Sequence, residues 1–171
     1  MMNIKLRTIA SVFATLITLV GCASDPPYYS FKAVPIDDYA ATTNHLRVLA
    51  TQAAFKYGID HRLFHALIKH ESNWDPYAIS RKGARGLTQI MPRTGRFQCG
   101  LERDLLLDPQ FNLDCGAFYF SKLLRRFGSV RLALAAYNSG ETRVARLGRV
   151  PRIRETQRYV KRVMASWQRG G

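Results

Sequence analysis

The feature that most constrains this chain is an apolar helical stripe that ends in a carboxyl group. Residues three and four apart share one face of an α-helix. That spacing unites five residues of the segment LFHALIKHES: Leu63, Phe64, Leu67, Ile68 and Glu71. Because burial disfavours a charged carboxylate, we expect Glu71 to stay protonated near neutral pH, as a general acid must. A Glu at the end of a buried helix more often has a purely structural role, so other motifs must decide between the two.

Helix start and stop signals recur from Asp37 to the C-terminus. Asp60 is expected to cap the helix that ends at Glu71, and the stretch 77–85 is expected to form a loop or a small irregular hairpin. No long alternating run indicates a substantial sheet, so the predicted fold class is mostly α with at most a minor β element. The predicted helices span residues 37–57, 60–71, 86–91, 109–127, 129–137, 141–147 and 154–167.

The N-terminal segment has the features of an export signal. Lys5 and Arg7 precede the apolar run Thr8 to Val20, which is too short to span a bilayer as a mature helix but is typical of a signal-peptide core. The run closes on Leu-Val-Gly-Cys22, which resembles a bacterial lipobox in which Cys22 becomes the lipidated first residue. By resemblance to bacterial lipoproteins, the Ala-Ser pair that follows favours sorting to the outer membrane.

Three segments are therefore expected along the chain. Residues 1–21 form the signal peptide, residues 22–36 a lipidated N-terminus and tether, and residues 37–171 a single domain. The tether contains Asp25-Pro26-Pro27 and Pro35, and prolines favour an extended chain over a helix. A domain of about 135 residues can bury one core but not two.

The charge of the chain points to a polyanionic partner. Its formal net charge is +14. For an exported chain the polyanion is the cell wall or lipid headgroups and not nucleic acid, although a merely solvated basic face is the alternative. The bases crowd the C-terminal part, where they are opposed only by Glu155: Arg143, Arg146, Arg149, Arg152, Arg154, Arg158, Lys161, Arg162 and Arg169.

Cysteines and histidines give no sign of metal or cofactor chemistry. If Cys22 is lipidated, Cys99 and Cys115 remain as an even pair, which favours a disulfide in an oxidising compartment; two buried thiols are the alternative. His61 and His65 lie one turn apart without a third-ligand pattern, so we expect no metal site. No cofactor is expected either.

Several short blocks in fixed order carry a resemblance to a known family. The blocks are HES at residues 70–72, WDP at 74–76, Ser80, GARGLTQIMP at 83–92, AYNSG at 136–140 and ETQRYV at 155–160. Over about residues 45 to 165 the chain resembles the soluble-lytic-transglycosylase (SLT) domain family, which cleaves the glycan strands of bacterial peptidoglycan. The resemblance implies a lysozyme-like helical fold.

The resemblance also implies a mechanism with one carboxyl group, whereas glycosidic cleavage normally takes two. Glu71 would protonate the oxygen between N-acetylmuramic acid (MurNAc) and N-acetylglucosamine (GlcNAc), and would then act as base toward the C6 hydroxyl. The 2-acetamido group would stabilise the cationic sugar carbon. The product would be a 1,6-anhydroMurNAc end, formed without water.

Further site residues follow from the same resemblance. Ser80 matches a serine near the acetamido and C6 groups, and Gln89 a groove glutamine whose amide can donate to and accept from sugar hydroxyls. Tyr137 and Asn138 match the pair that orients the acid and the acetamido group. Tyr159 resembles a groove tyrosine near the acid, with core packing as its alternative.

One position departs from the family pattern. Thr88 stands where the family usually has Met, which predicts an altered apolar floor beneath the sugar.

The expected partners are peptidoglycan strands and, through the lipid anchor, a membrane. The expected location is the periplasm-facing side of the outer membrane. A lysozyme-type muramidase that admits water and a non-catalytic wall-binding accessory of a secretion apparatus remain as alternatives. The sequence leaves open whether the chain serves general wall turnover or a secretion, conjugation or pilus machine.

Overall fold

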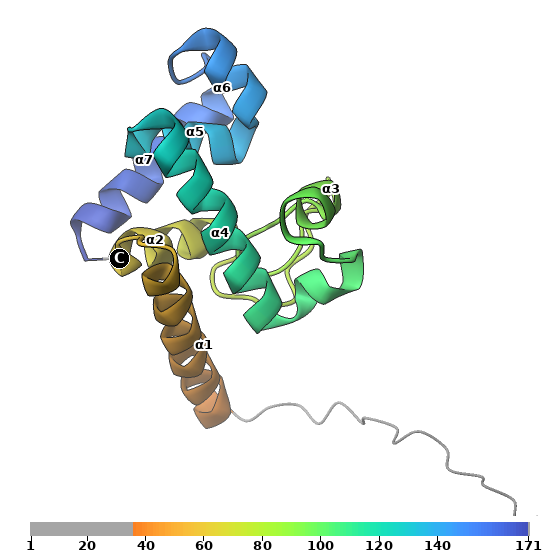
Figure 1. Ribbon diagram of the computed structural model, residues 1–171. Coiled ribbons are helices and arrows are strands. Elements are labelled where there is room, and N and C mark those ends of the chain that lie inside the picture. The colour runs from red at the N-terminus through yellow and green to blue at the C-terminus, as the bar shows by residue number, and fades with distance from the viewer. Residues whose placement is uncertain (1–35, 171) are drawn as a thin grey trace, which may run out of the picture. The chain divides into compact units, whose positions relative to one another are not determined.

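The computed structural model describes residues 36–170, and every regular element within them is helical (Figure 1). The expected fold class is confirmed: the only β features in this range are isolated bridges, from Ile79 to Arg85 and from Arg85 to Ile90. The helices are α1 (Ile36–Lys56), α2 (His61–Glu71), α3 (Pro92–Thr94), the π-helical turn η1 (Gly95–Cys99), the 3-10 helix η2 (Arg103–Leu107), α4 (Pro109–Phe127), α5 (Val130–Ser139), α6 (Glu141–Leu147) and α7 (Arg154–Gln168).

The expected signal peptide, Cys22 and nearly all of the tether lie outside the described residues. Within residues 36–170, no helix has both the length and the apolar character needed to cross a membrane.

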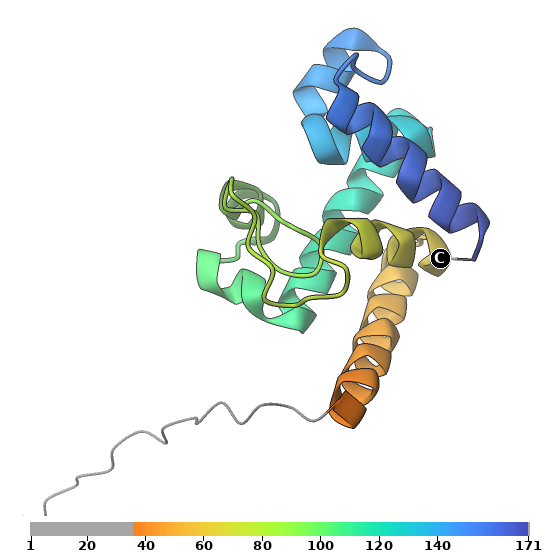
Figure 2. The same ribbon diagram turned by 180° about the vertical axis from the view of Figure 1, so that it is seen from behind.

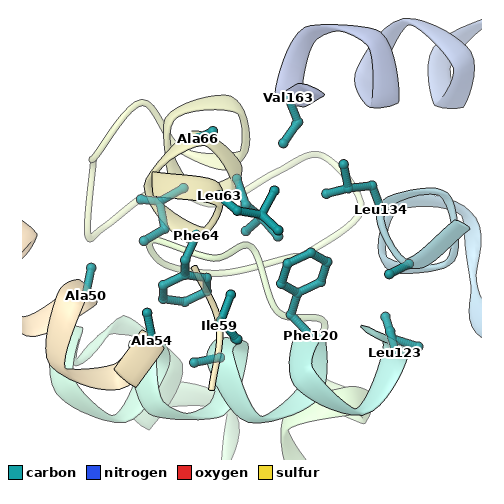
Figure 3. Packing of buried hydrophobic residues seen from close by; sticks show 14 of the residues in the cluster. Ala50, Ala54, Ile59, Leu63, Phe64, Ala66, Phe120, Leu123, Leu134 and Val163 are labelled. Carbon is teal, nitrogen blue, oxygen red and sulfur yellow. The ribbon is translucent and has the colours of Figure 1, made fainter. Parts of the chain in front are cut away.

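The apolar stripe of α2 lies at the centre of the core. Phe64 of α2 faces the small residues Ala50 and Ala54 of α1, and Phe120 of α4 lies on the other side of the stripe (Figure 3). The side chains of Leu63, Phe64, Leu67 and Ile68 are at most 2% exposed. Burying a side chain of this size contributes about 1.5–3 kcal/mol. The stripe predicted from spacing alone is therefore buried in the core, and α1 and α7 pack directly against α2.

Capping residues define the ends of α2 and α4 at the positions predicted from the sequence. The Asp60 carboxylate accepts the backbone N–H groups of Arg62 and Leu63 at the start of α2. Asp108 caps α4 in the same way, and Gly128 ends α4 with a φ of 60°. These positions confirm the predicted boundaries of both helices to within one residue.

The helix predicted over residues 86–91 is wrong. Residues 86–89 form a tight turn closed by the Arg85–Ile90 bridge. Gly86 and Gln89 have φ values of +72° and +49°, which lie in the left-handed region and cannot continue a right-handed helix. Pro92 opens α3 instead of ending a preceding helix.

A disulfide joins η1 to α4. Cys99 and Cys115 are bonded with a Cα–Cα distance of 5.7 Å across a sequence separation of 16 residues. The alternative of two buried thiols is therefore excluded. The bond fixes the segment that follows the turn 86–89 against the long helix on which that turn rests.

Candidate active site

Helix α2 stops abruptly after Glu71, its last residue. The backbone N–H of Ser72 still bonds to the carbonyls of Ile68 and Lys69, but Asn73 and Trp74 then adopt φ values of 55° and 70°. Such values are uncommon outside glycine and cost of order 1–3 kcal/mol each, so the surrounding structure must hold them. The Trp74 ring is buried and helps to hold this backbone conformation. It lies edge-on to His65 at 5.2 Å and beneath the Arg47 guanidinium at 4.8 Å.

Glu71 has an environment that balances its two protonation states. Burial raises the pKa of its carboxyl group to about 7, and the hydrogen bond donated by the Tyr159 hydroxyl, at 2.6 Å, limits the rise. Among the ion pairs of residues 36–170, none involves Glu71. A carboxyl group with a pKa near the ambient pH can both release and accept a proton.

The Glu71 side chain opens onto a cleft of about 330 Å³. Four of the five other predicted site residues line this cleft with it: Ser80, Gln89, Tyr137 and Asn138. The fifth, Tyr159, lies behind the carboxyl group and reaches it through the hydrogen bond described above. The structure thus brings all six residues together, although they come from α2, the 72–91 connection, α5 and α7.

Ser80 stabilises the turn at the edge of the cleft. Its Oγ accepts the N–H of Ala84 at 3.0 Å, and its own N–H donates to the Ala84 carbonyl at 2.9 Å. The hydroxyl proton of Ser80 has no acceptor within the described residues and is available to a ligand.

Gln89 has less hydrogen-bonding capacity than the sequence suggested. Its amide nitrogen donates to two backbone carbonyls, those of Ala78 at 3.0 Å and Gly86 at 2.9 Å. Since both amide protons are used, the expectation that this amide donates to sugar hydroxyls is wrong. The Oε1 atom alone remains for the cleft, where it can only accept.

The two tyrosines make different hydrogen bonds from those that the family resemblance implies. The hydroxyl that bonds to Glu71 belongs to Tyr159, whereas the Tyr137 hydroxyl donates to the Thr88 carbonyl at 2.8 Å. The Tyr137 ring packs edge-on against Phe120 at 5.7 Å. Burial, together with the nearby Glu71 charge, raises the pKa of each tyrosine well above its usual value of 10, so both hydroxyls stay protonated as donors.

Thr88 does not line the cleft, so the altered apolar floor beneath the sugar stays a prediction. Its side chain is fully buried and faces α4, where its Oγ1 donates to the Asn112 carboxamide oxygen at 2.7 Å. Gly116 makes this approach possible, because a Cβ there would come within 2.4 Å of the Thr88 hydroxyl.

Asn112 was not predicted as a site residue, yet it is buried and makes four side-chain hydrogen bonds. Its Oδ1 accepts the backbone N–H and the hydroxyl of Thr88, and its Nδ2 donates to the carbonyls of Arg85 and Leu106. A single Asn in a helical segment gives no local signal of this role. The role of Asn112 becomes apparent only in the structure, where the turn 86–89 packs against α4.

The cleft wall also contains residues that were not predicted as site residues: Arg81, Lys82, Ala84, Met91 and Glu155. Glu155 is a second carboxyl group in the cleft. The block ETQRYV contains Glu155, but the sequence pattern indicated only that this residue opposes the basic side chains of the C-terminal part. No group of His, Cys, Asp and Glu side chains within residues 36–170 has a geometry that could hold a metal ion.

Comparison with known proteins agrees with this geometry. Residues 48–160 match the family model described as the transglycosylase SLT domain. The chain is 41% identical over 96 residues to the membrane-bound lytic murein transglycosylase F 1 of Alkalilimnicola ehrlichii, an alignment that covers 52% of this chain and 19% of that protein. It is 37% identical over 115 residues to the membrane-bound lytic murein transglycosylase C of Photorhabdus laumondii, covering 58% of this chain and 32% of that one.

A solved structure is similar as well. The 70 kDa soluble lytic transglycosylase of Escherichia coli superposes with a TM-score of 0.64 at 31% identity, over 70% of this chain and 23% of that one. In each of these three comparisons the match spans less than a third of the relative's own length.

Proposed function

Since the chain belongs to the transglycosylase SLT domain family, we propose that it is a peptidoglycan lytic transglycosylase. It cleaves the bond between MurNAc and GlcNAc without water and leaves 1,6-anhydroMurNAc ends. The observation that carries the proposal is Glu71: a carboxyl group with a pKa of about 7, outside any ion pair of residues 36–170, at the wall of a cleft large enough for sugar rings.

Glu71 acts twice in the proposed reaction. In its protonated form it gives a proton to the glycosidic oxygen, and the bond to the MurNAc anomeric carbon breaks. The 2-acetamido group of MurNAc stabilises that carbon in place of a second carboxylate. The Glu71 carboxylate then removes the proton from the C6 hydroxyl of the same ring as its oxygen attacks, which closes the anhydro bridge and restores the acid.

The other site residues hold the sugar in position for these steps. The free hydroxyl proton of Ser80 and the amide of Asn138 bind the acetamido and C6 groups, while Gln89 Oε1 accepts from a sugar hydroxyl. Tyr159 keeps the Glu71 carboxyl group turned toward the cleft through its 2.6 Å hydrogen bond. General acid–base catalysis contributes about 10²- to 10⁴-fold, so this positioning must supply much of the remaining rate.

The proposed location is the cell envelope. The membrane-bound and soluble murein transglycosylases that the chain resembles support it, and so does the signal-like N-terminus. We further propose that Cys22 carries lipid and anchors the chain to the outer membrane, facing the periplasm. Several acyl chains, at about 0.8 kcal/mol per buried methylene, would hold it there.

One observation favours a second candidate, a muramidase. Glu155 lines the same cleft as Glu71, and a hydrolase could use it as the second carboxyl group that activates water. Such an enzyme would depend on Glu155 as strongly as on Glu71.

Digestion of purified peptidoglycan in ¹⁸O-labelled water, followed by mass spectrometry, tests the proposal. The wild-type chain is expected to release muropeptides with anhydro ends, each one water lighter than a hydrolytic product and free of the label. Glu71→Gln should reduce release by at least about 10²-fold. Glu102→Gln, the same change at an exposed side chain on another surface, serves as the matched control.

Labelled reducing ends that require both Glu71 and Glu155 would favour the muramidase. Absence of products from the folded wild-type chain would contradict both enzymatic candidates and support a non-catalytic wall-binding role.

A further inference from the structure

The turn that begins at Ser80 brings two adjacent cations to the cleft. Arg81 and Lys82 occupy its two central positions, and Gly83 closes it by donating its N–H to the Ser80 carbonyl at 2.9 Å. Two further bonds between Ser80 and Ala84 brace the same turn. The turn belongs to the connection that runs from the end of α2 to α3 (Figure 2). Its backbone is therefore fixed, and both side chains start from defined positions.

These cations are not neutralised by the protein. Both side chains line the cleft that contains Glu71, and neither takes part in an ion pair of the described chain. Glu155, the other acidic residue of the cleft wall, is not within ion-pair distance of either. With Glu71 protonated, the cleft carries two positive charges and one negative charge.

Neither cation lies within ion-pair distance of the reacting carboxyl group. Burial and the Tyr159 hydroxyl account for the pKa of Glu71, without a contribution from Arg81 or Lys82. Two charges close to the carboxylate would have lowered that pKa. Their target is therefore a different part of the bound molecule from the glycosidic oxygen.

We propose that Arg81 and Lys82 bind a carboxylate carried by the glycan, so that the cleft selects acidic saccharides over neutral ones. This inference rests on the proposed function, because it takes a glycan as the ligand. MurNAc bears a lactyl ether whose carboxylate is either free or extended by a peptide, whereas GlcNAc bears no acid. A guanidinium matches a carboxylate with two parallel hydrogen bonds, and an adjacent ammonium adds a point charge.

The turn favours selective binding of a carboxylate because the conformational entropy of its backbone is already lost during folding. The three hydrogen bonds of the turn fix the backbone at Arg81 and Lys82 before a ligand arrives, so only the two side chains become ordered on binding. The same turn holds Ser80, which contacts the sugar in the proposed reaction. Binding of the acidic substituent at its tip therefore positions the ring that reacts.

Calorimetric titration of two tetrasaccharides of equal length tests the inference, with Glu71→Gln as the background so that nothing is cleaved. One ligand alternates GlcNAc and MurNAc with free lactyl carboxylates, and the other is the neutral GlcNAc tetramer. At low ionic strength the Glu71→Gln chain is expected to bind the acidic ligand at least about tenfold more tightly. Adding Arg81→Gln and Lys82→Gln should bring the two affinities close together.

The matched control is the pair Arg125→Gln and Lys161→Gln, which removes the same charges from exposed positions on α4 and α7 outside the cleft and should keep the preference. Arg81→Lys, which retains the charge but loses the two parallel hydrogen bonds, should keep only part of the preference. A preference that survives Arg81→Gln/Lys82→Gln, or equal binding of both ligands by Glu71→Gln, would overturn this inference alone. If the folded Glu71→Gln chain bound neither tetrasaccharide, the inference and the proposed function would fail together.

Discussion

At the scale of single residues, the pKa of Glu71 results from two opposing effects. Burial disfavours the carboxylate, and the hydrogen bond from Tyr159 favours it, so the pKa settles at about 7. A more exposed carboxyl group would be ionised at neutral pH and could not donate a proton. A more isolated one would hold its proton too tightly to return to the carboxylate form.

Replacing Tyr159 with Phe should move the pH dependence of catalysis. The variant loses a hydrogen bond that lowers the pKa of Glu71, so that pKa rises. Because the acid must be protonated to act, kcat/KM falls as the pH rises through the pKa. We expect the midpoint of this basic limb to move up by about one pH unit in Tyr159→Phe.

Tyr137→Phe is the comparison for this measurement. Its hydroxyl donates to the Thr88 carbonyl and not to Glu71, so the midpoint should stay where the wild type has it, whatever happens to the rate. Equal shifts in the two variants would mean that the Tyr159 hydrogen bond does not set the pKa.

Sequence patterns identified the residues of the cleft but not their bonds. Helical spacing selected Glu71, and family blocks indicated Ser80 and Gln89, all of which line one cleft. The use of both Gln89 amide protons by backbone carbonyls depends on the left-handed φ of that residue. Such a conformation is fixed by tertiary contacts, which a local pattern does not contain.

At the scale of elements, the turn 86–89 depends on α4. Asn112 of α4 makes two hydrogen bonds to Thr88 and one each to the carbonyls of Arg85 and Leu106. The Tyr137 hydroxyl holds the same turn from α5 through the Thr88 carbonyl. Gln89 therefore lies at the cleft because side chains of α4 and α5 hydrogen-bond to Thr88, the residue before it.

Asn112→Ala should destabilise the fold and impair catalysis together. The change removes four hydrogen bonds, three of them buried, and leaves their partners without replacements, so we expect a loss of about 3–5 kcal/mol in the free energy of unfolding. Denaturant unfolding measures this loss, and kcat under folding conditions should fall as the turn loosens.

Ser121→Ala is the matched control on the same helix. Ser121 is also buried, but its hydroxyl bonds only to the Phe118 carbonyl within α4, so its loss should cost less than about 1 kcal/mol. An Asn112→Ala chain as stable as Ser121→Ala would contradict the role given to Asn112.

The long helices were predictable, whereas the segment between α2 and α4 was only partly so. Asp60, Asp108 and Gly128 act locally on the backbone beside them, and each gave the correct boundary. The turn 86–89 was predicted as a helix because its sequence has ordinary helical character. Its actual shape comes from Asn112, more than twenty residues away along the chain.

At the scale of the whole molecule, the half-buried acid Glu71 makes stability depend on pH. The pKa of Glu71 is about 7 in the folded chain, against 4.5 for an unperturbed carboxyl group. Between these values the folded state binds more protons than the unfolded state. The contribution of Glu71 to stability therefore falls as the pH rises from about 4.5 through about 7.

Glu71→Gln should consequently gain stability over the wild type as the pH rises. The difference in unfolding free energy between the two chains should grow by about 2–3 kcal/mol in favour of Glu71→Gln between pH 4 and pH 8. Parallel denaturation of both chains across this range measures it, because other titrating groups cancel in the comparison. A difference that stays constant with pH would mean that the native carboxyl group is solvated.

The most direct test of the account is the titration of the Glu71 side-chain carboxyl itself. Carbon-13 NMR of selectively labelled glutamate, assigned by comparison with Glu71→Gln, follows its protonation in the folded wild-type chain. We predict a midpoint near pH 7 for Glu71. A midpoint near 4.5 would show a carboxyl group already ionised at neutral pH, and would contradict the claim that one half-buried acid carries the proton of this reaction.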